Sequence, residues 1–202
     1  MSGRPTRVAL VVTLAAVAVA VTAAVTMWRW GGPSATTTAE LRDTVVRFDL
    51  AKAHTLPVEF VGRELTAADR QALQQAFERR LERVSAGEEL AGWRQWDYVE
   101  ALLYDAQGRG RLPVDCSGEV VYWEFLRREV GGLVVVRAGV AQRYRMVEWD
   151  AAEGQVVSRP DWVPNAVVYD YTLERAGGVW KVVDTRHWRF WDAATGELST
   201  GP

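Results

Sequence analysis

The sequence predicts an α+β domain behind a single N-terminal transmembrane helix. Three observations carry this prediction: an uncharged apolar stretch near the N-terminus, helical spacing of apolar residues in the first half of the chain, and alternating apolar residues from residue 118 onward. Helices followed by consecutive long strands indicate an antiparallel sheet with the helices on one face. A chain of 202 residues with 49% hydrophobic content has room for one ordinary domain plus accessory segments.

The apolar stretch covers residues 8–28, VALVVTLAAVAVAVTAAVTMW, and contains no charged residue, glycine or proline. As a helix it is long enough to cross a bilayer. A cleavable signal peptide is the alternative, favoured by the Ala-x-Ala-like text around Ala23, but the apolar region of a signal peptide spans roughly 7 to 15 residues. Arg4 and Arg7 favour a cytoplasmic tail over residues 1–7. We therefore expect a single-pass protein of the cytoplasmic membrane with an extracytoplasmic C-terminal domain.

In this prediction residues 29–39 form a turn-rich linker, residues 40–195 the domain and residues 196–202 a tail. The part from residue 40 onward carries 21 basic and 26 acidic residues, and this negative balance argues against nucleic-acid binding. Cys116 is the only cysteine, which excludes a disulfide within the chain, and two histidines give little support to a metal centre. We expect neither a metal nor a cofactor.

Two cap patterns predict the first helices of the domain. Thr37 followed by Glu40 predicts a helix over about residues 38–53. The residues that recur along this helix at helical spacing are Leu41, Val45, Phe48 and Lys52. Thr66 followed by Asp69 predicts a second helix, with a clear apolar stripe that ends near residue 87.

The rest of the domain is predicted to contain one short helix and four strands. Residues 88–106 have an aromatic content that also suits a strand, and we expect a third helix there. The expected strands are Glu119–Arg127, Leu133–Trp149, Val167–Arg175 and Val179–Trp191. The predicted fold is therefore two or three helices packed on a four-stranded antiparallel sheet.

Gly177 and Gly178 predict a two-residue type I′ turn between the last two strands, because both positions of that turn require positive φ. A straight ladder from this turn gives the pairs Leu173–Val182, Glu174–Lys181, Tyr171–Asp184 and Tyr169–Arg186. On this register His187 points to the outer face, opposite to Asp184, so the two cannot form an acid–base pair.

The side of this hairpin that faces the helices carries four polar groups: Tyr169, Tyr171, Asp184 and Arg186. They form either a buried network in which Asp184 and Arg186 neutralise each other, or a ligand-binding site. In the second case burial raises the pKa of Asp184 and makes it a general base, with the two tyrosines as hydrogen-bond donors. The first interpretation is favoured, because the neighbouring guanidinium opposes that rise in pKa.

Three tryptophans are candidate interface residues, because large aromatic side chains often anchor protein interfaces. They are Trp149, Trp162 and Trp191, which lie near predicted loops or strand ends.

The aromatic strand, glycine turn and Trp-Lys-Val segment resemble the closing hairpin of the nuclear transport factor 2-like (cystatin-like) superfamily. The residues that carry this resemblance are Tyr169, Tyr171, Gly177, Gly178, Trp180, Lys181 and Val182. The resemblance covers about residues 40–192 and implies a curved, cone-like sheet with a concave face. The superfamily includes isomerases, dehydratases and polyketide cyclases, which commonly use an Asp or His in the cone, and many non-catalytic modules. Asp184 is the residue that matches this description.

A single N-terminal span followed by one such domain also resembles the assembly subunits of type IV secretion systems, in which the domain serves protein–protein contact. Our leading hypothesis is a non-catalytic binding or assembly module of a bacterial cell-envelope complex. Residues 8–28 would anchor it, and its partner would be an envelope protein or a second copy. The alternative is a small-molecule binder, or a lyase- or isomerase-type enzyme that uses the concave face with Asp184 as general base and Tyr169 and Tyr171 as donors.

Overall fold

The computed structural model describes Thr22 and residues 32–109, 111–129, 131–192 and 194–199. The predicted membrane span lies outside these residues, apart from Thr22. Across the described part of the chain, no helix combines the length and the apolar character needed to cross a membrane.

The helices occupy the first half of the domain. They are α2 (Ala35–Lys52), the short 3₁₀ helix η1 (Val58–Phe60), α3 (Ala67–Val84), α4 (Gly87–Arg94) and α5 (Tyr98–Arg109). The capping box predicted for α3 is confirmed, since the Thr66 hydroxyl accepts from the Asp69 N–H at 3.2 Å and the Asp69 carboxylate accepts from the Thr66 N–H at 3.0 Å. The cap predicted for α2 is wrong: the helix begins earlier, and the Ser34 hydroxyl accepts from the Thr37 N–H at 3.2 Å.

The single third helix expected over residues 88–106 is wrong, because the structure has α4 and α5 there. The break falls at Gln95–Asp97, and the carboxylate of Asp97 accepts a hydrogen bond from the Glu100 N–H at 2.9 Å. Such a carboxylate satisfies a backbone donor that a new helix leaves open at its N-terminus. Asp97 therefore restarts the helix, and a search for apolar periodicity alone does not detect this.

Within the described residues the sheet is antiparallel and has six strands, not four. They are β1 (Leu112–Arg128), β2 (Val134–Asp150), β3 (Gln155–Trp162), β4 (Ala166–Ala176), β5 (Val179–Trp191) and β6 (Leu198–Ser199), in the order β1-β2-β4-β5-β6. The long strand β2 pairs with β4 along its first half and with β3 along its second half. Strand β3 is mostly exposed and contains Pro160, so it lacks the apolar alternation that predicts a strand.

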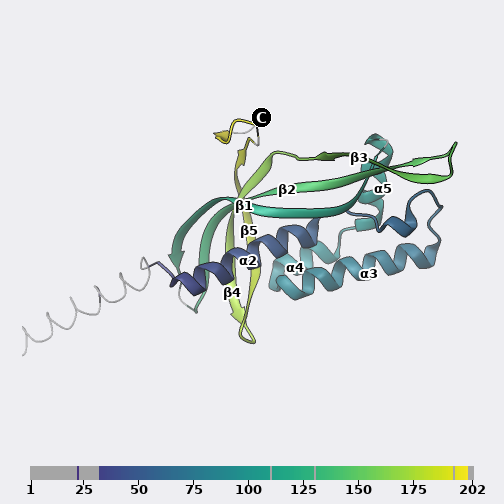
Figure 1. Cartoon of the computed structure of the whole chain (residues 1–202). Coiled ribbons are helices and arrows are strands. Elements are labelled where there is room, and N and C mark those ends of the chain that lie inside the picture. Colours follow the sequence, from purple (N-terminus) through teal and green to yellow (C-terminus); the bar gives the residue numbers. More distant parts are fainter. Residues whose placement is uncertain (1–21, 23–31, 110, 130, 193, 200–202) are drawn as a thin grey trace, which may run out of the picture.

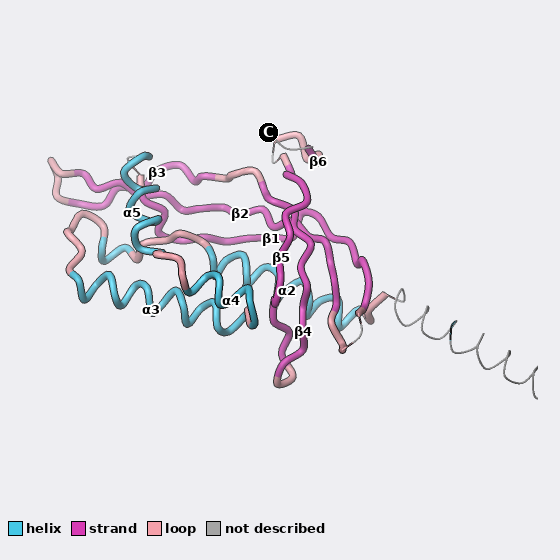
Figure 2. Tube along the Cα trace, turned by 180° about the vertical axis from the view of Figure 1, so that it is seen from behind, coloured by secondary structure: helices cyan, strands magenta, loops and turns pink. Residues whose placement is uncertain are grey.

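The sheet curls, and the helices gather on its concave side (Figures 1 and 2). Helix α2 supplies the side chains at the centre of this packing, since Leu41, Val45 and Phe48 are fully buried. They belong to one core cluster with Tyr171 of β4 and Val182 of β5. The α+β class and the concave sheet face are thus observed. Helix α2 packs on this face and would contact a ligand bound there.

The register of the β4–β5 hairpin agrees with the prediction near the turn and departs from it beyond. Gly177 and Gly178 have φ angles of 58° and 84°, and the pairs Leu173–Val182 and Glu174–Lys181 are confirmed. The ladder then shifts by one residue at Val183, so that the next pairs are Thr172–Asp184, Tyr171–Thr185 and Asp170–Arg186. The predicted pairs Tyr171–Asp184 and Tyr169–Arg186 are therefore wrong.

A β-bulge explains the error, because one extra residue on one strand moves the side chains that follow to the other face of the ladder, here as far as a second shift between His187 and Arg189. Asp184 and Arg186 lie opposite Thr172 and Asp170 instead of the tyrosines. The same shift brings His187 opposite Tyr169, so the prediction that His187 faces outward is also wrong.

Candidate functional site

A cavity of about 310 Å³ opens between the C-terminal end of α2, helix α4 and the concave side of β2 and β4. Its polar and aromatic lining residues are Asp49, Lys52, His54, Trp93, Gln142, Tyr144, Trp162, Asn165 and Tyr169. This volume is at the lower end of the range for small-molecule sites, which runs from about 300 to 1,000 Å³. The cavity is the candidate functional site.

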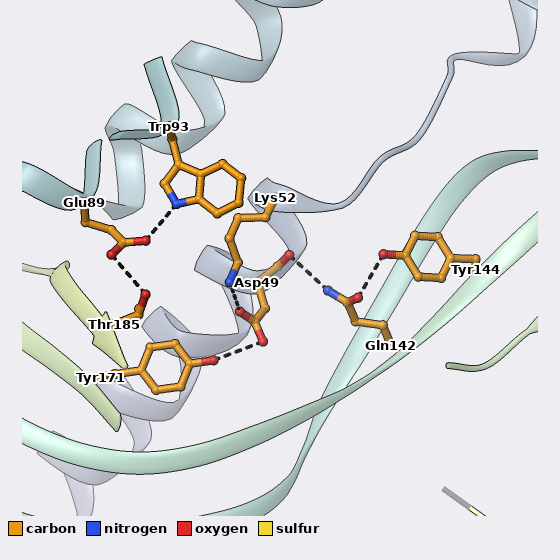
Figure 3. A network of polar contacts seen from close by, with 8 residues as sticks. All are labelled: Asp49, Lys52, Glu89, Trp93, Gln142, Tyr144, Tyr171 and Thr185. Atoms are coloured by element: carbon orange, nitrogen blue, oxygen red, sulfur yellow. Dashed lines mark hydrogen bonds and ion pairs between the residues drawn. The ribbon is translucent and has the colours of Figure 1, made fainter. Parts of the chain in front are cut away.

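Asp49, in the last turns of α2, lies at the wall of this cavity, with Oδ1 in an ion pair whose geometry falls short of a hydrogen bond and Oδ2 in a hydrogen bond (Figure 3). The Lys52 ammonium lies 2.8 Å from Oδ1, and the Tyr171 hydroxyl donates to Oδ2 at 3.1 Å. Tyr171 is fully buried, and this burial, together with the adjacent carboxylate, raises the pKa of its phenol well above the ordinary value. Tyr171 therefore stays protonated and serves as a fixed hydrogen-bond donor.

Lys52 follows Asp49 by three residues, which places the two side chains on the same face of α2. Its ammonium also lies over aromatic rings, 4.5 Å from the centroid of Phe48, 5.0 Å from that of Tyr169 and 5.8 Å from that of Trp93. The ion pair and the rings stabilise a positive charge here. The cavity therefore contains a fixed cation.

Gln142 of β2 attaches the end of α2 to the sheet. Its Nε2 donates to the backbone carbonyl of Asp49 at 3.1 Å, and its Oε1 accepts from the Tyr144 hydroxyl at 2.9 Å. The last carbonyls of a helix lack partners within the helix, and this amide satisfies one of them. The position of the Asp49–Lys52 pair relative to β2 is thereby fixed.

Trp93 forms the opposite wall and is held by a chain of hydrogen bonds (Figure 3). Its Nε1 donates to one oxygen of Glu89 at 2.7 Å, and the other oxygen of Glu89 accepts from the Thr185 hydroxyl at 3.0 Å. These bonds join α4 to β5. The bulge at Val183 thus has a local consequence, since it places Thr185 opposite Tyr171 and within reach of Glu89.

The structure separates the four polar residues that the sequence grouped. Tyr169 lines the cavity, and the Tyr171 hydroxyl donates to the carboxylate of Asp49 in the cavity wall. Asp184 and Arg186 line no part of this cavity; their side chains are 49% and 81% exposed and lie 3.3 Å apart. The carboxylate that contacts the tyrosine is Asp49, which the sequence reasoning missed. The sequence feature that could have indicated a polar site here is Lys52, a charged residue at the position that continues the apolar stripe of Leu41, Val45 and Phe48 along α2.

The two histidines lie in different surroundings. His187 is exposed, and its ring lies 6.0 Å from that of Tyr169 and 4.9 Å from that of Phe190. His54 follows the end of α2, lines the cavity, and has its ring 4.7 Å from that of Trp96.

The three candidate interface tryptophans lie in different places. Trp149 packs directly on the backbone of Gly62, where an added Cβ would come within 2.2 Å of the indole. Trp162 lines the cavity with its ring 5.2 Å from that of Tyr144. Trp191 lies on the outer side of the sheet, 6.5 Å from the ring of Tyr122. Their role in an interface stays a prediction.

A second hollow of about 590 Å³ shares Trp93 with the candidate cavity and is also lined by Glu88, Glu89, Trp96 and Asp184, but it is more open to solvent. Burial raises the pKa of the Cys116 thiol to about 11, so it is protonated and unreactive at neutral pH. Within the described ranges, no group of three or more His, Cys, Asp or Glu side chains is placed to hold a metal ion.

Comparisons with known proteins identify no family. No protein-family description and no curated protein matches the sequence. Among solved structures, the intermembrane-space region of the chloroplast protein ARC6 overlays with a TM-score of 0.38 at 13% sequence identity, covering 77% of this chain and 98% of that one. The resemblance to the nuclear transport factor 2-like superfamily therefore stays a prediction.

Proposed function

We propose that this chain is a membrane-anchored extracytoplasmic binding module that takes a small ligand into the cavity beside α2 and has no catalytic role. The observation that supports it most is the state of the two charged groups in the cavity. Lys52 presents a fixed cation to the cavity, whereas Asp49, the one carboxylate of the described lining, is ion-paired with Lys52 at Oδ1 and accepts from Tyr171 at Oδ2. These two charged groups therefore suit the cavity to ligand binding better than to removal of a proton from the ligand.

The proposal includes no catalytic role because the expected general base is not placed to reach a ligand in the cavity. A general base must come within hydrogen-bond distance of the proton that it abstracts. Asp184, the base of the enzyme alternative, is half-exposed beside Arg186 and outside the cavity. Tyr171, its expected partner, has a raised pKa and donates to Asp49. Asp184 lines the more open second hollow and not the cavity of Tyr169, so the alternative that joins Asp184 with the two tyrosines in one site gains no support from the geometry.

The membrane placement in this proposal rests on the sequence. Residues 8–28 would anchor the chain. Residues 35–39 of the predicted linker belong to α2, so the part before the helix would hold the domain within about 20 Å of the bilayer, given the length of an extended chain. An envelope protein or a second copy would bind the exposed surface, with Trp149 and Trp191 as candidate contacts. Crosslinking in the native membrane, followed by mass spectrometry, tests this part: a stoichiometric envelope protein supports it, and recovery of the chain without any partner or second copy contradicts it.

The ligand-binding function is tested by plugging the cavity. Asn165 is an exposed residue of the lining, so Asn165→Trp would fill the opening without replacing a core residue. Val179→Trp, at the exposed end of the β4–β5 hairpin, is the matched control. We expect small molecules released from full-length protein purified under mild conditions to include one that wild type and the control retain and Asn165→Trp lacks. Identical small-molecule profiles for all three proteins would contradict the proposal.

A further inference from the structure

We infer that the ligand of this cavity is a small organic acid with a planar aromatic body, whose carboxylate contacts the Lys52 ammonium. This inference rests on the proposed binding function and names the chemical class that the site selects.

The hydrogen-bond donors of Lys52 indicate that the ligand carries a carboxylate. An ammonium has three N–H donors. Within the described residues, the Asp49 carboxylate at 2.8 Å is the one acceptor that contacts it, and its other close neighbours are the faces of aromatic rings. The side chain is 15% exposed, so water is only partly available to the remaining donors. A carboxylate in the cavity would supply the missing acceptors through charge-assisted hydrogen bonds.

The existing ion pair does not exclude a second carboxylate. Asp49 accepts from Tyr171 at Oδ2, and Gln142 donates to its backbone carbonyl, so the residue is held against the sheet. The Lys52 ammonium lies on the Oδ1 side of that carboxylate. The Lys52 side chain is 15% exposed and that of Asp49 is 7% exposed, so the ammonium is the more accessible of the two charges to an incoming anion. A cationic ligand, in contrast, would meet Lys52 with no free carboxylate in the described lining to receive it.

The aromatic side chains that line the cavity indicate that the ligand has a planar ring. Trp93, Tyr144, Trp162 and Tyr169 contribute aromatic surface to a cavity of about 310 Å³, which is small for a ligand site. Aromatic pairs stabilise each other through stacked or edge-to-face contacts. The ring of Tyr144 already lies 5.2 Å from that of Trp162, and hydrogen bonds hold Trp93 and Tyr144 in place. One ring system fits between such walls better than a long flexible chain.

Two fluorinated probes that differ only in charge test this inference. Full-length protein in phosphatidylcholine nanodiscs is titrated with 4-fluorophenylacetate and with 4-fluorophenylacetamide, and binding is followed by ¹⁹F NMR. We expect wild type to bind the acid about tenfold more tightly than the amide, because only the acid gains a charge-assisted bond. Lys52→Met should abolish this preference while still binding the amide. Lys181→Met is the matched control, since Lys181 is the second of the two lysines, lies on β5 and donates to the Glu82 carbonyl of α3.

Two further variants keep the test decisive if Lys52→Met unfolds. Lys52→Arg should keep the preference for the acid, and Asp49→Asn/Lys52→Met, which leaves no unpaired charge, should lose it. Equal binding of acid and amide by wild type, a preference that survives loss of Lys52, or binding of neither probe would overturn the inference. The proposed binding function fails separately, if the Asn165→Trp variant retains the same small molecules as wild type.

Discussion

Two ion pairs on opposite sides of the sheet differ in how completely they are satisfied. On the outer side, Arg137 of β2 donates to both oxygens of Asp170, at 2.7 and 3.1 Å, lies 3.6 Å from Glu124, and stacks at 3.9 Å on the ring of Trp188. On the concave side, the Lys52 ammonium has Asp49 as its one acceptor within the described residues. The first pair has used its donors within the fold, whereas Lys52 has one ion-pair partner and lines a cavity.

This difference separates a structural network from a binding site. A guanidinium forms two parallel bonds to a carboxylate, and such bidentate pairs fix geometry between neighbouring strands. An ammonium is a point charge with three rotatable donors and can accept a new partner without losing the old one. We therefore assign a structural role to Arg137 and a ligand-contacting role to Lys52. The following predictions test that assignment in order of decreasing effect.

The largest effect on stability is expected for Lys52→Met. It leaves the buried carboxylate of Asp49 without its cation, and loss of one partner of a buried pair typically costs about 3 kcal/mol. Urea unfolding of the full-length protein, followed by tryptophan fluorescence, measures this loss. The double variant Asp49→Asn/Lys52→Met should recover most of it, and a single variant as stable as wild type would contradict the assignment of a buried pair.

A smaller loss, about 2 kcal/mol, is expected for Arg137→Met. The pair is more exposed than the one in the cavity, with side-chain exposures of 19% for Arg137 and 27% for Asp170. Binding of the small-molecule ligand should be unchanged, because the pair lies on the other side of the sheet. A variant that loses ligand binding while remaining folded would show that the outer pair is not merely structural.

Tyr171→Phe is expected to cost about 1 kcal/mol at pH 7, the usual contribution of one hydrogen bond. It should also change the pH dependence. The pKa of Tyr171 is raised in the folded state, so the stability from this shift is present below the unfolded value of about 10 and is lost as the pH rises above it. Between about pH 10 and 11, wild type should therefore lose stability more steeply than the variant, and parallel curves would contradict the raised pKa.

The smallest effect is expected for Asp184→Asn. Its side chain and that of Arg186 are largely exposed, and such surface pairs contribute little. We expect a change within about 0.5 kcal/mol in unfolding free energy and no change in ligand binding. A folded variant that loses ligand binding would contradict this expectation and support the site predicted from sequence, in which Asp184 contacts the ligand.

The sequence was sufficient where local signals specify local structure. The capping box at Thr66 predicted the start of α3, and the turn at Gly177 and Gly178 predicted the hairpin and its first pairs. It was insufficient at the bulge in β5, where one extra residue changes the face of the residues from Asp184 to His187. The extra residue at Val183 has no sequence signature of its own, because a valine fits either a regular ladder or a bulge.

The candidate site required contacts between distant segments. Asp49 and Tyr171 are 122 residues apart, and only the curl of the sheet around α2 brings them together. The position of Lys52 on the apolar stripe of α2 was nevertheless visible in the sequence. A charged residue on a buried stripe is costly unless it is paired, so it marks a place where a partner must be sought.

The most direct test uses the fact that the chain has only two lysines. Full-length protein labelled with ¹³C and ¹⁵N at lysine alone should give two resolved side-chain signals, assigned with Lys52→Met and Lys181→Met. The small-molecule fraction released from natively purified protein is then added back to the stripped, labelled protein. We predict that the signal of Lys52 shifts and that of Lys181 does not. A Lys52 signal that stays unchanged while the molecule binds would contradict the assignment of Lys52 as the ligand-contacting residue of the cavity.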